Sequence, residues 1–161
     1  MIIIMGVSGC GKTTIGKLIS RETDLDFYDA DNFHTAQNIT KMENNIPLSD
    51  ADRLPWLHTL SSKIQGWARE GGAILACSAL KESYRKILAS KVDTIFWIYL
   101  YGSFDLIESR LEERQGHYMS PDLLRSQFNT LEIPNYGLHI NIELSKEEIV
   151  KKIMSNLKGN E

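Results

Sequence analysis

The most constraining feature of the sequence is the segment "GVSGCGKT" at residues 6–13, directly after the apolar run "MIIIM". The spacing Gly6-x-x-x-x-Gly11-Lys12-Thr13 matches a phosphate-binding loop (P-loop), whose backbone N–H groups converge on an anion. Such a loop must follow a strand and open a helix, and the flanking segments "MIIIM" and "KTTIGKLISRET" fit both conditions. A glycine-rich turn with a chance lysine is the weaker alternative.

The loop predicts nucleotide binding. Its glycines let the backbone fold tightly around a phosphate, and the helix N-terminus adds partial positive charge. We expect Lys12 to reach the β- and γ-phosphates and Thr13 to coordinate Mg²⁺. The predicted nucleotide-binding residues are Gly6, Val7, Ser8, Gly9, Cys10, Gly11, Lys12, Thr13, Thr14 and Arg110.

Apolar runs of strand length recur along the chain, at residues 1–5, 27–28, 73–77, 95–101 and 138–144. They are continuous rather than alternating, which is typical of parallel strands covered on both faces. Helices are expected to begin near Gly11, Asn32, Ser49, Leu80, Ser103, Ser120 and Ser145. The pattern predicts an α/β fold: a three-layer P-loop NTPase fold with a five-stranded parallel sheet, helices on both faces and a helical lid near residues 110–120.

The composition predicts one domain over residues 1–161, because the chain is long enough for one good core and has no linker. A net charge of −3 gives no reason to expect a nucleic acid or a membrane as partner. Cys10 and Cys77 cannot form a disulfide framework, and no secretory signal is visible. These features favour a cytoplasmic protein.

Two carboxylates follow the second apolar run, in the segment "FYDADNFH" at residues 27–34. Asp29 and Asp31 alternate, so both side chains would leave one side of an extended chain. In a phosphotransferase, one would hold the metal's water shell and the other would accept a proton from an attacking hydroxyl. A helix cap is the alternative for this motif.

The segment "SRLEERQGH" carries Arg110 and Arg114 on one helical face, followed by His117. Arginines on a closing lid can stabilise the charge of a transferring phosphoryl group and exclude water. A solvated face paired with neighbouring glutamates is the alternative.

Further polar residues are candidates for binding an acidic substrate. Arg53 lies near a predicted helix start, where the helix dipole disfavours a cation. Ser78 and Lys81 follow the carboxyl end of a predicted central strand, the edge at which open α/β sheets bind ligands. His34 could hydrogen-bond the substrate. For Arg85, a surface role is about equally plausible, and Trp56, Trp67 and Trp97 are expected in the core.

These residues together resemble the small P-loop gluconokinases, which are related in fold to shikimate and nucleoside monophosphate kinases. The likeness rests on collinear segments from Gly6 to about Pro134: "GVSGCGKT", "DADNFH", "NITKMENNIPLSDADRLPWL", "CSALKESYR", "RLEERQGHYM" and "LLRSQFNTLEIP". The chain departs from the family pattern at Ala30, Thr35, Asn45 and Tyr118, where Gly, Pro, Gly and Phe are common.

The resemblance implies transfer of the ATP γ-phosphate to the C6 hydroxyl of D-gluconate with Mg²⁺, and it suggests a homodimer. It implies Asp31 as base, Asp29 beside Thr13 at the metal, and Lys12, Arg110 and Arg114 in catalysis. The substrate would lie among Asp31, His34, Arg53, Ser78, Lys81 and His117. Another small-molecule kinase of this fold and, more remotely, a nucleotide-gated binding protein remain the alternatives.

Overall fold

The computed structural model describes residues 1–113 and 120–159. Within these residues, five strands form one parallel sheet in the order β2-β3-β1-β4-β5. The strands are Ile2–Met5 (β1), Phe27–Asp29 (β2), Ile74–Ala76 (β3), Phe96–Tyr101 (β4) and Leu138–Asn141 (β5). Each predicted apolar run therefore coincides with a strand of the sheet, and β2 extends one residue past its run, to Asp29.

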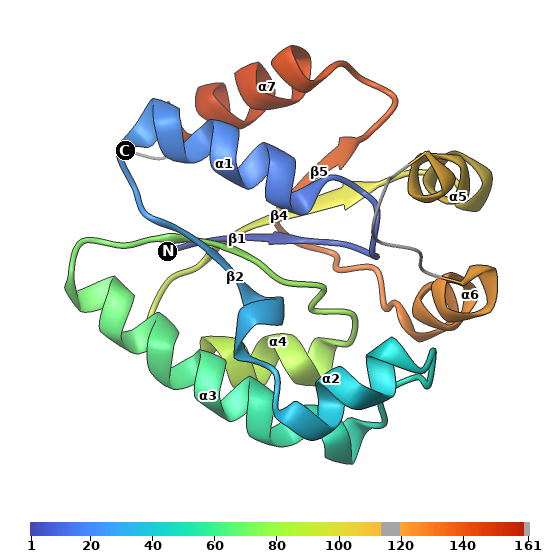
Figure 1. Cartoon of the computed structure of the whole chain (residues 1–161). Helices are drawn as coiled ribbons and strands as arrows, with labels where there is room; N and C mark the ends of the chain where they lie inside the picture. Colours follow the sequence, from blue (N-terminus) through green and yellow to red (C-terminus); the bar gives the residue numbers. More distant parts are fainter. Residues whose placement is uncertain (114–119, 160–161) are drawn as a thin grey trace.

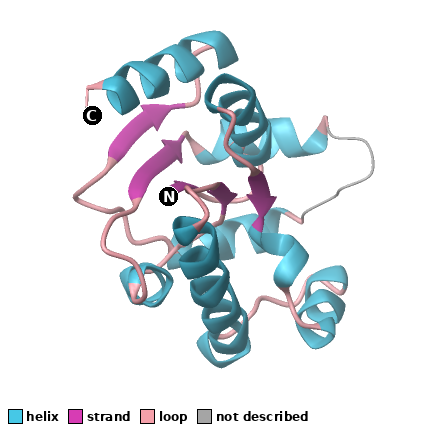
Figure 2. Cartoon of the chain, turned by 90° about the vertical axis from the view of Figure 1, so that its left-hand side faces the viewer, coloured by secondary structure: helices cyan, strands magenta, loops and turns pink. Residues whose placement is uncertain are grey.

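Helices lie on both faces of this sheet (Figures 1 and 2). Helices α1 and α7 pack together on one face, while α3 and α4 pack together on the other. Helices α5 and α6 lie beyond the carboxyl ends of the strands (Figure 1). The described helices are α1 (Lys12–Thr23), α2 (Ala36–Glu43), α3 (Asp50–Arg69), α4 (Glu82–Ala89), α5 (Phe104–Glu112), α6 (Pro121–Thr130) and α7 (Lys146–Lys158). This arrangement confirms the predicted three-layer α/β architecture.

Local side-chain hydrogen bonds explain where several helices begin. The Ser145 hydroxyl accepts from the N–H of Glu148 at 3.2 Å, and the Glu148 carboxylate accepts from the N–H of Ser145 at 2.9 Å. This is the capping box predicted for the last helix. Ser120 caps α6 in the predicted position, with Pro121 in the first turn.

The prediction that an α-helix begins near Asn32 is wrong. A 3₁₀ turn, η1, occupies Ala30–Phe33, and α2 begins only at Ala36. The turn forms because the Asp29 carboxylate accepts a hydrogen bond from the N–H of Asp31 at 3.1 Å, which closes the backbone just after β2. Asp31 therefore lies on a tight turn and not on the extended chain that the alternation predicted.

The last strand is also shorter than expected, since β5 ends at Asn141 and not at residue 144. The side-chain oxygen of Asn141 accepts from the N–H of Glu143 at 2.9 Å. A hydrogen bond that an asparagine side chain accepts from the N–H two residues later is typical of a turn. The backbone therefore turns away at this point instead of continuing to pair with β4. The chain consequently leaves the sheet beside the P-loop and enters α7 after Ser145.

The buried apolar residues form one cluster that runs along both faces of the sheet. The side chains of β1 lie at its centre, and Trp56, Trp67 and Trp97 are buried as predicted. Cys10 and Cys77 are buried free thiols, and burial raises the pKa of Cys77 to about 12. In residues 1–113 and 120–159, no helix has the length and apolar character needed to cross a bilayer.

Candidate active site

The predicted P-loop connects β1 to α1. Gly6 and Gly11 adopt positive φ angles of 140° and 98°, which L-residues with side chains rarely adopt. A Cβ atom on Gly6 would lie 2.5 Å from the carbonyl oxygen of Leu100 on β4, so a side chain would clash there. The Lys12 ammonium donates to the carbonyl of Val7 at 2.8 Å and so lies across the loop.

Two oxygen-bearing side chains meet beside this loop. The hydroxyl of Thr13, at the start of α1, donates to the carboxylate of Asp29 at 2.8 Å. The second carboxylate oxygen of Asp29 accepts from the N–H of Asp31. A hydroxyl and a carboxylate are hard oxygen ligands of the kind that Mg²⁺ takes, together with waters and substrate phosphates. Thr13 and Asp29 thus have the chemistry of a magnesium site.

Asp31 lies just past the end of β2. Strand β2 pairs with β3 in parallel, and β3 pairs with β1, so the carboxyl ends of all three strands meet at one edge of the sheet. The Asp31 side chain is 82% exposed. Asp29 connects Asp31 to Thr13 through two hydrogen bonds, which holds the Asp31 backbone beside the P-loop.

His34 is buried behind Asp31. Its side chain is only 4% exposed, and its ring stacks on Trp56 with centroids 4.2 Å apart. Its Nδ1 lies 3.4 Å from the side-chain nitrogen of Asn38, and its Nε2 lies 3.8 Å from Asp31. Burial, and then the positive charge of Arg53, lowers the pKa of His34 to about 4. The imidazole is therefore neutral near pH 7.

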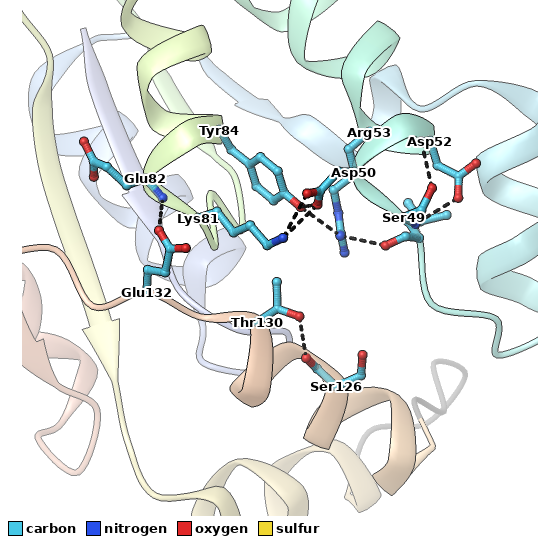
Figure 3. Close-up of polar contacts among 11 residues, drawn as sticks. Ser49, Asp50, Asp52, Arg53, Lys81, Glu82, Tyr84, Ser126, Thr130 and Glu132 are labelled. Carbon is cyan, nitrogen blue, oxygen red and sulfur yellow. Dashed lines mark hydrogen bonds and ion pairs between the residues drawn. The ribbon is translucent and has the colours of Figure 1, made fainter.

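Arg53 and Lys81 come together in a polar cluster with Asp50 and Tyr84, which we call the acceptor cluster (Figure 3). The Lys81 ammonium donates to both carboxylate oxygens of Asp50, at 2.9 and 3.0 Å, and the Tyr84 hydroxyl donates to the same carboxylate. Arg53 donates to the carbonyl of Leu48 at 2.7 Å and contacts the Tyr84 hydroxyl at 3.3 Å.

The charges of this cluster support one another. The hydrogen bond from Tyr84, and next that from Lys81, holds the pKa of Asp50 below its usual value. The hydrogen bond to Asp50 raises the pKa of Lys81. The cluster combines two cations with one carboxylate, so it can receive a further anion.

Ser78 lies in the segment that connects β3 to α4, and Arg85 lies on α4. The carbonyl of Ser78 accepts from the N–H of Gly6 at 3.3 Å. Arg85 is 2% exposed, which excludes the surface role considered for it. Its guanidinium donates to the carbonyls of Ala79, at 2.7 Å, and Glu132, at 2.9 Å. Lys81 precedes α4 as its N-cap, and its carbonyl accepts from the N–H of Arg85 at 3.2 Å.

A cavity of about 310 Å³ opens on the other side of the P-loop. Arg110, on α5, lines it and donates to the carbonyl of Ile142 at 2.8 Å. Part of the remaining lining comes from the P-loop and α1, and part from Ile142, Leu144, Lys146 and Ile149. This second group was missed, because the last strand and helix carry no sequence motif. Arg114 and His117 lie outside the described residues.

Two of the departures from the family pattern have local backbone roles. Thr35 caps α2, since its side chain accepts from the N–H of Asn38 at 3.2 Å. Asn45 has a positive φ of 55°, a conformation that glycine and asparagine tolerate. Ala30 is fully buried under Trp56, whose indole N–H donates to its carbonyl at 2.8 Å. Tyr118 lies outside the described residues.

Three further residues of the site carried no assigned role in the sequence. Asp50 and Tyr84 complete the acceptor cluster, and Gln127 on α6 accepts a hydrogen bond from the P-loop. All three stand within segments that carry the family likeness. No spacing rule separates them from their neighbours, so their roles depend on the folded arrangement.

The comparisons with known proteins agree with this geometry. A family model described as shikimate kinase matches residues 8–158. The chain is 40% identical to a protein of Mus musculus named probable gluconokinase, over 98% of this chain and 97% of that relative. The solved structure of a gluconokinase from Sinorhizobium meliloti is similar with a TM-score of 0.88 at 34% identity, and covers 99% of this chain and 95% of its own.

An unliganded sugar kinase from Janibacter sp. HTCC2649 is similar with a TM-score of 0.92 at 37% identity, over 98% of this chain and 93% of that chain. The likeness to each of these relatives therefore extends over nearly the whole length of this chain and of the relative, in sequence as well as in fold. Residues 8–13 of the P-loop and the neighbouring carboxylates lie within the region that the family model matches. The chain is a kinase of the P-loop fold, and it belongs to the gluconokinase family.

Proposed function

We propose that the chain transfers the γ-phosphoryl group of ATP to the C6 hydroxyl of D-gluconate, which yields 6-phospho-D-gluconate and ADP. The observation that carries this proposal is the connection of Thr13, Asp29 and Asp31 by two hydrogen bonds, because it holds an exposed carboxylate beside a phosphate-binding loop. The names of the similar proteins support gluconate as acceptor.

In this proposal the nucleotide's phosphates lie in the P-loop, against its backbone N–H groups and Lys12. The adenine ring of the nucleotide lies in the cavity beside Arg110. Ile142, Leu144 and Ile149 line this cavity and offer apolar contact to the ring. Thr13 and Asp29 would hold Mg²⁺, and the ion would supply positive charge that offsets the negative charge of the nucleotide's phosphates. Only Thr13 and Asp29 are assigned to the metal, in keeping with the tendency of Mg²⁺ to retain several waters.

Asp31 acts as general base. The hydroxyl oxygen of the acceptor attacks the γ-phosphorus, the bond from this phosphorus to the β–γ bridging oxygen breaks, and the hydroxyl proton passes to the Asp31 carboxylate. Lys12 stabilises the negative charge on the transferring group. Arg110 and Arg114 are proposed to assist in the same way. No phosphorylated enzyme is needed, since in-line transfer requires mainly positioning.

The acceptor cluster binds the carboxylate end of gluconate. A carboxylate needs a cation at the end of the molecule remote from the reacting hydroxyl, and Arg53 and Lys81 supply two. His34, Ser78 and His117 are proposed to contact the hydroxyl groups. A neutral His34 suits that role, because one ring nitrogen can accept while the other donates.

Three broader expectations remain predictions. The single continuous core supports one domain over residues 1–161. A homodimer is suggested only by the family likeness. A cytoplasmic location follows from the sequence features and is compatible with the two free thiols.

The function is tested with purified protein and Mg-ATP in a coupled assay of ADP release. Gluconate is expected to stimulate ADP release strongly, and phosphorus NMR should identify a phosphate monoester at C6. Shikimate, nucleoside monophosphates and other sugar acids serve as competing acceptors. Activity with one of these and none with gluconate would contradict the proposal. ATP hydrolysis that no acceptor stimulates would point to a nucleotide-gated binding protein.

A further inference from the structure

Gln127 joins two parts of the chain that are far apart in sequence. Its side-chain oxygen accepts a hydrogen bond from the N–H of Ser8, in the P-loop, at 2.7 Å and across 119 positions. A backbone N–H can only donate, so the oxygen and not the nitrogen of the amide must face Ser8. Helix α6 is thereby attached to the tip of the P-loop through one side chain.

The carboxyl end of α6 is attached elsewhere, to the turn that leads into α4. The N–H of Glu132, just after α6, donates to the carbonyl of Leu80 at 2.8 Å. The Glu132 carboxylate accepts from the N–H of Glu82 at 2.7 Å, and its carbonyl accepts from buried Arg85. This turn also carries Lys81 of the acceptor cluster. The end of α6 is therefore tied to the acceptor side of the site.

Helix α6 lies opposite the acceptor cluster (Figure 3). Figure 3 shows Ser126 and Thr130 of α6 across from Lys81 and Asp50. Leu124, one turn before Phe128, is buried in the core and holds the helix against the rest of the protein. A helix of 10 residues is short and stiff, so fixing it at two points fixes the distance between them.

We propose that Gln127 is a positioning residue, which sets the distance between the P-loop and the acceptor cluster through α6. This inference rests on the proposed function, in which the P-loop holds the phosphoryl donor and the cluster holds the acceptor. Since Gln127 already uses the Ser8 N–H, the phosphates take the amides from Gly9 onward. Gln127 therefore affects phosphoryl transfer and acceptor binding, and it leaves nucleotide affinity nearly unchanged.

The test compares wild-type protein with Gln127→Met, which keeps the length of the side chain and removes the acceptor oxygen. The matched control is Asn129→Ala, at an exposed position of the same helix. For Gln127→Met, kcat/KM for gluconate should fall about tenfold, since one hydrogen bond is lost and the reacting groups are misplaced. The Kd for Mg-ADP should stay within threefold of wild type, and Asn129→Ala should match wild type in both.

A second variant removes the donor instead. Ser8→Pro lacks the N–H, so it and Gln127→Met abolish the same bond. The double variant should then lose no more kcat/KM than the more impaired of the two single variants. Additive losses would overturn the proposal. Thermal unfolding of each variant identifies any loss of folded protein, so that kinetics are compared per folded molecule.

The outcomes separate the two hypotheses. Without gluconate turnover in the wild-type protein, the proposed function fails and the positioning role fails with it. With normal wild-type turnover, an unchanged kcat/KM in Gln127→Met overturns the positioning role alone. A rise of the Mg-ADP Kd in parallel with the loss of kcat/KM also overturns it, because Gln127 would then support the nucleotide site as a whole.

Discussion

The nucleotide side and the acceptor side of this site are built in different ways. On the nucleotide side, one stretch of eight residues, 6–13, supplies the P-loop, and backbone groups supply most of its chemistry. On the acceptor side, Asp31, Arg53 and Lys81 come from three separate segments of the chain. Side chains supply the chemistry there, and long-range hydrogen bonds hold them in place.

The difference determines what each side tolerates. A backbone cradle depends on φ angles and on close approach, so it is sensitive to any added side chain and insensitive to which side chains its middle positions carry. A side-chain cluster can be changed one group at a time. Substitutions on the acceptor side should thus separate acceptor binding from nucleotide binding, while substitutions at the loop glycines should damage both.

The largest effect is expected from Asp31→Asn. The amide keeps the size of the side chain but cannot take the proton of the attacking hydroxyl, so kcat should fall about 10³-fold. The Kd for Mg-ADP, measured by calorimetry, should remain within threefold. Asp26→Asn, at an exposed position just before β2, is the control. A kcat near the wild-type value would remove Asp31 from the role of base.

Gly6→Ala tests the backbone side and should have the next largest effect. The added Cβ would meet the Leu100 carbonyl oxygen at 2.5 Å and the Cys10 sulfur at 2.8 Å, at a φ of 140°. We expect a loss of about 3 kcal/mol in the free energy of unfolding, together with loss of Mg-ADP binding. Urea denaturation measures the first quantity.

The matched control for Gly6 is Gly71→Ala. Gly71 has a φ of 106°, but a Cβ there would meet nothing within 4 Å. The Gly71→Ala variant should lose only about 1 kcal/mol in the free energy of unfolding, because the added side chain strains the backbone there. It should keep the nucleotide affinity of the wild type. Equal losses in the two variants would show that close approach of β4 is unimportant.

Arg53→Met should act on the acceptor alone. Methionine retains much of the side-chain length without the charge, so the KM for gluconate should rise about tenfold, as expected for the loss of one charged hydrogen bond. The KM for ATP should not change. Arg69→Met, at the exposed carboxyl end of the same helix, controls for the change in net charge. An unaltered KM for gluconate would place the carboxylate elsewhere.

The smallest effect concerns pH and His34. Because the folded-state pKa is about 4 and the unfolded value is about 6.5, the unfolded chain binds more protons between these values. Stability should therefore fall as the pH drops through this window, with a contribution from His34 of about 1 kcal/mol between pH 7 and 5.5.

Thermal unfolding at several pH values measures this contribution. His34→Gln should show a shallower decline of Tm with falling pH than wild type does, whatever its absolute Tm. His58→Gln, at an exposed position of α3, should keep the wild-type decline. Identical declines in all three proteins would mean that the pKa of His34 is the same in the folded and the unfolded protein, contrary to its burial against Trp56.

The sequence predicted the parts of the molecule whose signals are local. Continuous apolar runs indicated the strands, and Ser120 and Ser145 indicated two helix starts, because caps and periodicity involve residues only a few positions apart. For Asp29 and Asp31, the alternation favoured an extended chain, and the structure instead shows the alternative, a cap, because the Asp29 carboxylate accepts from the N–H of Asp31 and closes the 3₁₀ turn. The sequence also left Arg85 undecided, because charge favours the surface while the fold supplies buried carbonyls for it.

The sequence alone determined that this chain is built around a P-loop at its first strand, with carboxylates after the second, because the loop motif is contiguous and its flanking strand and helix are also local signals. Only the tertiary structure decided which distant groups meet: the Lys81 ammonium and the Asp50 carboxylate, the Arg110 guanidinium and the Ile142 carbonyl, and the Gln127 side-chain oxygen and the Ser8 N–H. Such pairs join positions far apart in the chain. Their geometry is set by how helices pack on the sheet, and no local pattern encodes it.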